Sequence, residues 1–214
     1  MKIGILGSGI VAKTMGSGFI KYGHEVMLGT RNTQKLEEWQ TSEGKKASVS
    51  SFTEAAKFGE LVVLAVKGVV AELALESAGA ENFSEKTIID ATNPIAELPP
   101  IDGVLQYFTE QNGSLMETLQ AKFPEANFVK AFNSVGAALM VDPEFGGIKP
   151  TMCIAGNNEK AKREVTRILD AFGWETEDMG TAVAARAIEP LCMLWCIPGF
   201  RSNSWSHAFK LLKK

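Results

Sequence analysis

The chain has 214 residues, of which 45% are hydrophobic and 22% charged, and this globular composition fits one large domain or a core domain with a smaller companion. The net charge of -3 excludes a general electrostatic affinity for nucleic acid or an anionic membrane, so any basic residue that matters for binding must act locally. Three cysteines without a CxxC pair and only two histidines argue against a disulfide framework and a metal site.

The first ninety residues alternate short apolar runs with helical patterns. Strands are predicted over 3–6, 25–28 and 47–49, and helices over 11–21, 33–42 and 53–58. Continuous apolar runs at 61–66 and 87–91 indicate strands buried on both faces, with a helix over 69–77 between them. This alternation predicts an α/β fold with a doubly wound, mostly parallel sheet of the Rossmann type.

The rest of the chain begins with a loop over 95–113, which is rich in proline and glycine. Strands are then predicted over 127–132, 151–155 and 175–179, and helices over 114–123, 159–172 and 181–197. The stretch over 134–150 is the richest in turn residues, so we divide the chain into a larger domain, residues 1–134, and a smaller C-terminal domain, residues 135–214.

The apolar helix over 181–197, which we expect Pro198 and Gly199 to end, is apolar nearly all round, as buried helices are. Trp195 and its aromatic neighbours Phe200 and Trp205 extend this apolar surface, and we expect part of it to pack against a second subunit in a homodimer. Arg186 and Glu189 lie three residues apart and suggest a local ion pair, while His207 is expected at the surface.

Membrane segments are not expected, because the apolar stretches are interrupted before the ~20 residues that a bilayer requires. The apolar run at the N-terminus leads directly into a glycine turn and an amphipathic segment, which is not the pattern of a signal peptide. We therefore expect a cytoplasmic protein with no membrane partner.

A glycine motif, Gly7-Ser8-Gly9-Ile10-Val11-Ala12, connects the first predicted strand to the first helix and fits the dinucleotide pattern G-x-G-x-x-[GA]. Gly7 would allow the tight turn, Gly9 would let a pyrophosphate approach the backbone, and Ala12 would let the helix pack closely on the sheet. The N–H groups at the start of the helix then attract the phosphates. A glycine turn that binds no nucleotide is the alternative.

The end of the second strand carries Thr30 and Arg31, where NAD-binding proteins have an acid that binds the ribose 2′-hydroxyl. A guanidinium pairs with the 2′-phosphate of NADP, which a carboxylate would repel. Asn32 adds a neutral hydrogen-bonding group, and Lys35 lies one helical turn further on. The sequence therefore predicts NADP(H) as the cofactor, although a solvated turn with an idle arginine remains the alternative.

Six segments together resemble the NADPH-dependent F420 reductase family (F420:NADP oxidoreductases). They are the glycine segment from Gly4 to Asn32 and the stretches "VVLAVK", "DATNP", "VKAFNSV", "MCIAGNN" and "RAIEPLCMLW". The resemblance implies a Rossmann-type domain, a small C-terminal domain, and a cleft between them that holds the nicotinamide beside the second substrate. It also implies direct hydride transfer between nicotinamide C4 and the deazaflavin without a protein acid or base, so no catalytic residue is predicted.

The same resemblance assigns binding residues by position. Phosphate-loop residues are Ser8, Gly9, Ile10 and Val11; 2′-phosphate residues are Thr30, Arg31 and Lys35; residues near the adenosine ribose and pyrophosphate are Ala65, Val66 and Lys67; and residues near the nicotinamide are Asn93 and Pro94. Lys67 could alternatively do no more than end its strand. Asn133 follows a buried strand at the edge where ligands bind, and it is either a ligand for the nicotinamide or substrate or an ordinary turn residue.

The leading hypothesis is an NADP(H)-dependent oxidoreductase that moves hydride between nicotinamide and a small-molecule partner, which is F420, a flavin or a related acceptor. One alternative is an NADP(H)-binding regulatory module without turnover, and another is an imine reductase similar to pyrroline-5-carboxylate reductase. An enzyme needs open space beside the nicotinamide, whereas a sensor could fill it with Trp195 or Phe132.

Overall fold

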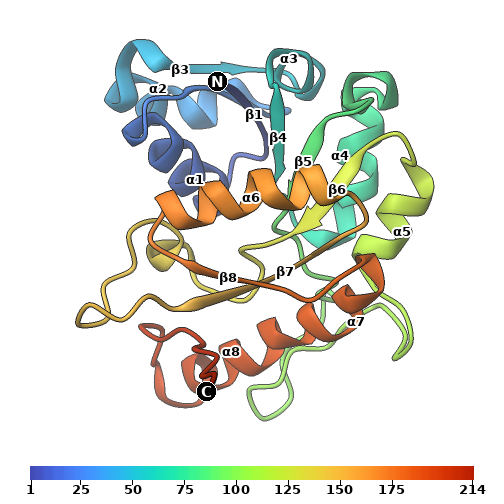
Figure 1. Cartoon of the computed structure of the whole chain (residues 1–214). Helices are drawn as coiled ribbons and strands as arrows, with labels where there is room; N and C mark the ends of the chain where they lie inside the picture. The colour runs from blue at the N-terminus through green and yellow to red at the C-terminus, as the bar shows by residue number, and fades with distance from the viewer.

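The computed structural model describes all residues, 1–214, as one eight-stranded sheet covered by helices on both faces (Figure 1). The strands are β1 (Lys2–Leu6), β2 (Glu25–Gly29), β3 (Ala47–Ser50), β4 (Leu61–Leu64), β5 (Thr87–Asp90), β6 (Asn127–Lys130), β7 (Thr151–Gly156) and β8 (Glu175–Asp178). The helices are α1 (Ile10–Lys21), α2 (Glu37–Glu43), α3 (Phe52–Phe58), α4 (Ala71–Ala78), α5 (Leu115–Lys122), α6 (Glu159–Ala171), α7 (Ala185–Ile188) and α8 (Pro190–Ser202). The predicted fold class is confirmed.

The strand order is β3-β2-β1-β4-β5-β6-β7-β8. All pairs from β3 to β6 are parallel, β6 and β7 are antiparallel, and β7 and β8 are again parallel. The order reverses between β1 and β4, because the chain leaves β1 toward β2 on one side and returns to β4 on the other. Ligands of doubly wound sheets bind outside the carboxyl ends of the strands at such a reversal.

Two apolar layers hold the helices on the sheet. One layer packs α1, α2 and α6 against one face, and the other packs α3, α4, α5 and α7 against the opposite face. Successive residues of β4 alternate between the layers: Leu61 and Val63 belong to the first, and Val62 and Leu64 to the second. All four side chains are fully buried, which explains why the strand is a continuous apolar run.

Residues after 134 extend the same sheet by β7 and β8 and add α6, α7 and α8. The tail beyond α8 returns along β7, where Thr151 N–H donates to the carbonyl of Phe209. The sheet therefore runs without interruption across the predicted boundary, and the division into two domains at residue 134 stays a prediction.

The C-terminal helices differ from the predicted helix over 181–197. The prediction that Pro198 and Gly199 end the helix is wrong, because α8 continues through both to Ser202. Pro198 lies only one turn from this end, so its missing N–H removes a single helical hydrogen bond. Asn203 then ends the helix in the left-handed conformation, at φ 53°, and its N–H donates to the carbonyl of Gly199.

The expectation that this helix is buried holds on one side only. Cys192, Trp195 and Gly199 of α8 are buried, whereas Leu194 is 55% exposed and Phe200 is 46% exposed. Because these side chains face outward, an apolar strip remains on the surface of the chain, and the homodimer stays a prediction.

A continuous helical stretch of 21 residues, Ala182–Ser202, has the length and composition of a membrane span. The expectation that every apolar stretch is too short for a bilayer is therefore wrong by these two criteria. Helices in the cores of soluble proteins meet the same criteria, and here 39% of the apolar window is buried inside the fold. The absence of a membrane partner stays a prediction.

Two further expectations for this region are wrong. Arg186 does not pair with Glu189 but forms a two-pronged ion pair with Glu117 on α5, with nitrogen–oxygen distances of 2.8 and 2.9 Å. His207 is half-buried rather than at the surface: its ring stacks on Trp195, and its Nε2 lies 2.9 Å from the carbonyl oxygen of that residue.

Candidate functional site

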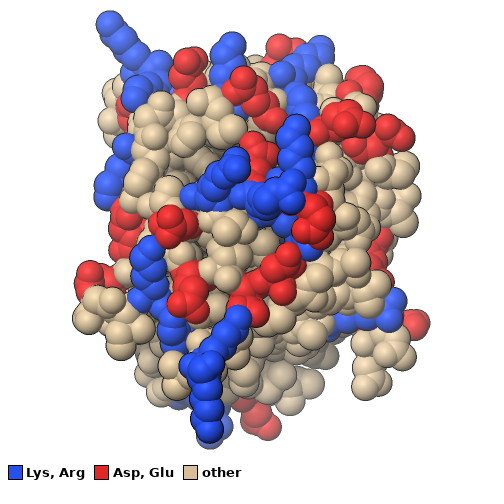
Figure 2. Space-filling view, viewed as in Figure 1, with Lys and Arg blue, Asp and Glu red and all other residues tan.

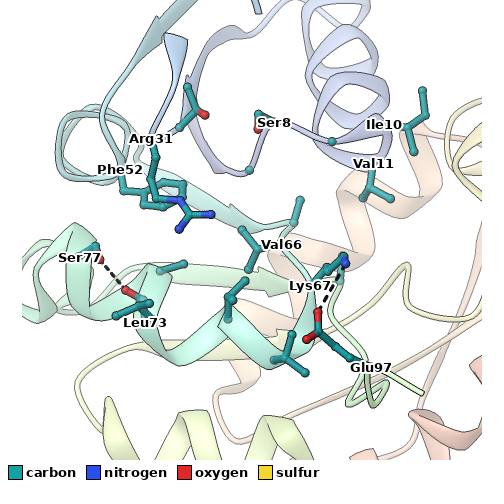
Figure 3. A pocket seen from close by; sticks show the side chains of 18 residues that line it. Ser8, Ile10, Val11, Arg31, Phe52, Val66, Lys67, Leu73, Ser77 and Glu97 are labelled. Carbon is teal, nitrogen blue, oxygen red and sulfur yellow. Dashed lines mark hydrogen bonds and ion pairs between the residues drawn. The ribbon is translucent and has the colours of Figure 1, made fainter. Parts of the chain in front are cut away.

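A cavity of about 670 Å³ opens at the carboxyl edge of the sheet, where the strand order reverses between β1 and β4 (Figure 3). Its walls come from the ends of β1, β2 and β4, from the first turns of α1 and α3, and from α4 between Leu73 and Ser77. Ten of the predicted site residues line it: Gly7, Ser8, Gly9, Ile10, Val11, Thr30, Arg31, Ala65, Val66 and Lys67. The structure thus brings the three predicted binding segments together around one space.

The other five predicted residues do not line this cavity. Asn93 lines a neighbouring cavity of about 400 Å³, and Asn32, Lys35, Pro94 and Asn133 line neither. Asn32 caps the 3-10 turn over Thr33–Leu36 by accepting a hydrogen bond from Gln34 N–H, and Lys35 is exposed on that turn. The binding roles of these residues stay predictions.

The apolar wall of the large cavity was not predicted from the sequence. This wall comes from α3, α4 and the segment before α4, and its residues are Phe52, Val69, Val70, Leu73 and Ala74, with the polar Ser77 beside them. Figure 3 shows Arg31 and Phe52 on the same side of the cavity, with Leu73 and Ser77 of α4 below them. Leu73 is 55% exposed, whereas the opposite face of α4 is buried. An apolar residue on the outer face of this helix could have indicated a binding surface in the sequence.

The two glycines of the phosphate loop have different roles. A Cβ on Gly7 would lie 2.3 Å from the carbonyl oxygen of Ala65, and Gly7 has φ +148°, so the fold itself requires glycine there. Gly9 has φ -81° and ψ -176°, which any residue can adopt, and a Cβ there would have no protein atom within 4 Å. The space beside Gly9 therefore belongs to the cavity, and the fold places no demand on this residue.

Backbone donors at the start of α1 face this same space. Gly9 caps the helix without a side-chain hydrogen bond, and the first intrahelical bond runs from Lys13 N–H to the Gly9 carbonyl. The first turn contains no acidic residue. The N–H groups of the first turn are thus left for a ligand, and the helix dipole favours an anion.

Arg31 forms no ion pair with any acidic residue of the chain. Thr30 before it is buried, and its hydroxyl oxygen accepts a hydrogen bond from Asn32 N–H, so the turn is held while the guanidinium stays free. Figure 2 shows acidic side chains beside the basic ones across one face of the molecule, in keeping with the net charge of -3. Any attraction for an anion at Arg31 is therefore local.

Lys67 lies at the other end of the cavity, where it is exposed and sits 3.8 Å from Glu97. Both residues line both cavities, so this pair stands where the two spaces meet. Exposed ion pairs of this length are weak, and Lys67 can leave Glu97 for a phosphate at small cost.

A buried charged cluster behind the smaller cavity also escaped the sequence analysis. Lys130 at the end of β6 is completely buried, and its ammonium group lies 2.7 Å from Asp90 and 2.9 Å from Glu189. Burial by itself lowers the pKa of Lys130, but the two carboxylates outweigh it, and the net pKa is raised above its ordinary value. Lysine therefore stays charged inside the fold. A lysine within the apolar run "FVKAF" was the available signal.

Asn133 belongs to this buried region rather than to the cavity wall. Its side-chain amide donates to Asn93 Oδ1 at 3.1 Å and to the carbonyl of Ile188 at 3.0 Å, and Asn93 donates back to the carbonyl of Asn133 at 2.7 Å. Neither Phe132 nor Trp195 lines the two cavities, so neither side chain fills them.

The reversal of strand order, the ligand cradle at Gly9 and the free arginine after β2 define a Rossmann-type dinucleotide-binding protein. The model of the family "NADP oxidoreductase coenzyme F420-dependent" matches residues 2–94. A solved structure assigned as an F420-dependent NADP reductase, from Arthrobacter sp. FB24, is 32% identical to this chain, with full coverage of both chains and a TM-score of 0.93. The chain belongs to this family of NADP-dependent oxidoreductases, which confirms the resemblance and the expected cofactor class.

Two other similarities extend the comparison. Metalloreductase STEAP3 of Rattus norvegicus is 30% identical over 206 residues, which cover 92% of this chain but 38% of that protein. The chain thus spans little more than a third of the curated relative that it matches. A reductive aminase from Aspergillus terreus, solved with NADPH and ethyl-5-oxohexanoate, shares the fold with a TM-score of 0.69 over 94% of this chain and 62% of its own, at 16% identity.

Proposed function

We propose that this chain binds NADP(H) in the large cavity and transfers hydride between the nicotinamide and a small acceptor of the F420 or flavin type. The observation that carries the proposal is the open space at Gly9, which adjoins free helical N–H groups and shares one cavity with the unpaired Arg31. Two anion sites in one elongated cavity suit a dinucleotide with an additional phosphate.

The chain's own residues bind and orient the cofactor in this proposal. The first turn of α1 receives the pyrophosphate, Arg31 pairs with the 2′-phosphate, and Phe52 and Leu73 form the apolar walls of the adenosine end. The nicotinamide supplies the hydride when the cofactor is bound, so the protein needs to place it rather than to donate a proton.

A substitution of Arg31 tests the cofactor assignment. Arg31→Ala should weaken NADPH binding by about 1–3 kcal/mol, roughly 5- to 150-fold, because it removes a charge-assisted contact to the 2′-phosphate. NADH, which lacks that phosphate, should bind nearly as before. Arg163→Ala on the exposed side of α6 is the matched control, since it removes the same charge away from the cavity. Equal losses for NADPH and NADH in titration calorimetry would contradict the proposal.

The acceptor requires a direct screen of NADPH oxidation against F420, FMN, FAD, ferric chelates and pyrroline-5-carboxylate. F420 and flavins come first because of the family, and ferric chelates are included because the rat relative is a metalloreductase. An imine is the second candidate, on the basis of the shared fold with the reductive aminase. Tight NADPH binding without oxidation by any of these acceptors would favour the regulatory module.

A further inference from the structure

We propose that the buried cluster of Lys130, Asp90 and Glu189 positions the nicotinamide half of the cofactor, with Glu189 as the positioning residue that ties the C-terminal helices to the ligand-binding edge of the sheet. The inference rests on the proposed function, since it concerns NADP(H) in the cavity described above. It goes beyond that function because it assigns a role to residues that touch neither cavity.

The first step is the control of the turn after β5. Lys130 donates to the carbonyl of Thr92 at 2.9 Å, and Asp90 Oδ1 accepts from both the N–H and the hydroxyl of Thr92, at 2.9 and 2.6 Å. Both sides of this turn are thus held by buried charges, which form strong hydrogen bonds in a medium that screens them little. The turn cannot shift without breaking contacts to the cluster.

The second step is that this same turn forms ligand-facing walls. Ala91 lines both cavities, and Thr92 and Asn93 line the smaller one. Figure 3 shows Arg31 at one end of the large cavity and Lys67 with Glu97 at the other. Ala91 lines both cavities, as Lys67 and Glu97 do, and so belongs to the Lys67 end. A dinucleotide with its 2′-phosphate at Arg31 therefore extends its nicotinamide half toward the turn after β5.

The third step is the link to the C-terminal helices. Glu189 is buried and accepts hydrogen bonds from Leu115 N–H and Met116 N–H at the start of α5, each at 3.0 Å, besides its ion pair with Lys130. One carboxylate thus joins α5, β6 and the junction of α7 and α8. The preceding residue, Ile188, accepts from Asn133, which in turn holds Asn93.

Burying three charged groups costs desolvation energy that an apolar core of the same size would avoid. A buried ion-pair cluster often stabilises no more than an apolar core of the same volume, so its presence calls for another explanation. The oxygen of the Asn133 side chain is also buried without a hydrogen-bond donor, and such an unsatisfied group calls for an explanation of its own. Precise placement of Thr92 and Asn93 supplies that explanation.

The test separates the two halves of the cofactor in the full-length protein. The variant is Glu189→Gln, which keeps the size of the side chain and loses its charge, and the control is Glu117→Gln, which removes an acid from the same helix start and breaks the pair with Arg186. The probes are 2′,5′-ADP, which carries the adenosine half alone, and NADPH, whose dihydronicotinamide fluorescence reports the other half. Thermal denaturation monitors folding in parallel.

We expect Glu189→Gln to bind 2′,5′-ADP within about twofold of wild type but NADPH about tenfold more weakly, with lower fluorescence anisotropy of the bound dihydronicotinamide. Glu117→Gln should leave both ligands and the anisotropy unchanged. Equal weakening of both ligands, or a lower melting temperature with unchanged NADPH affinity and anisotropy, would show a purely structural cluster and overturn the inference.

A second variant keeps the test decisive if Glu189→Gln does not fold. Thr92→Val removes only the hydroxyl that donates to Asp90 and leaves the ion pairs intact, and it should lower the anisotropy in the same direction. An unchanged anisotropy in that folded variant would likewise overturn the inference. Failure of the proposed function is a distinct result, because wild-type protein would then bind neither 2′,5′-ADP nor NADPH.

Discussion

Replacement of Gly9 by alanine should weaken cofactor binding strongly without damage to the fold. The backbone at Gly9 is in a region open to any residue, and the added Cβ would meet no protein atom within 4 Å. Alanine has less conformational entropy than glycine in the unfolded chain, which raises the free energy of unfolding by about 0.4–1 kcal/mol. Alanine is also a poorer N-cap than glycine, which lowers it by a similar amount. The melting temperature should therefore change by no more than about 2–4 °C, the effect of about 1 kcal/mol in a chain of this size.

The effect on binding should be much larger. The methyl group would stand where the pyrophosphate approaches the N–H groups of α1, and a hydrogen bond cannot form across it. Loss of two charge-assisted hydrogen bonds, each worth about 1.5–3 kcal/mol, weakens binding by at least about 100-fold. NADPH and NADH should be affected equally, because both carry the pyrophosphate, and Gly9→Val should abolish both.

Titration calorimetry with NADPH and NADH, combined with thermal denaturation, measures both quantities on the same preparation. Gly113→Ala is the matched control, since its Cβ would be 3.8 Å from the nearest atom, the Glu110 carbonyl oxygen, in a loop outside the cavity. Gly7→Ala should behave in the opposite way: its Cβ would clash with the carbonyl of Ala65, so this variant should lower the melting temperature of the protein. A folded Gly9→Ala protein with NADPH affinity within about threefold of wild type would refute the reasoning.

Two further outcomes are expected. Asp142 accepts hydrogen bonds from Lys21 and Tyr22, which lower its pKa below the ordinary 3.8, so its contribution to stability is present above that pH and is lost as the pH falls through the lowered value. Melting curves of wild type and Asp142→Asn should differ at pH 6, and the difference should shrink as the pH falls below 3.8; a constant difference would contradict this. The exposed apolar strip of α8 should pair two copies, and light scattering that finds a monomer at micromolar concentration would end the homodimer proposal.

Most strands and helices of the fold could be predicted from local sequence patterns. The apolar run of β4 predicts a central strand, and all four of its side chains are buried. The helix predicted over 114–123 is present as α5, and Ser114 is its N-cap. The phosphate loop and Arg31 were found because backbone geometry and charge at a strand end need no distant partner.

Contacts between distant segments could not be predicted in this way. Arg186 pairs with Glu117, 69 residues away, rather than with its neighbour Glu189, because α5 and α7 lie side by side only in the folded chain. The meeting of Lys130 with Glu189 is invisible for the same reason, as is the wall that Phe52 and Leu73 form around the large cavity. Pro198 misled the analysis because a helix near its end loses little to a proline.

The contacts of Glu189 with segments much earlier in the chain have a consequence for folding during synthesis on the ribosome. Strands β1 to β6 are complete once residue 130 has emerged. Until residue 189 follows, however, the N–H groups of Leu115 and Met116 lack their carboxylate acceptor, and Lys130 has only Asp90 of its two carboxylate partners. A nascent chain can therefore form most of its parallel sheet while the far end of the cofactor cavity is still loose. Competence to hold the whole dinucleotide should therefore arise only after residue 189 has been translated.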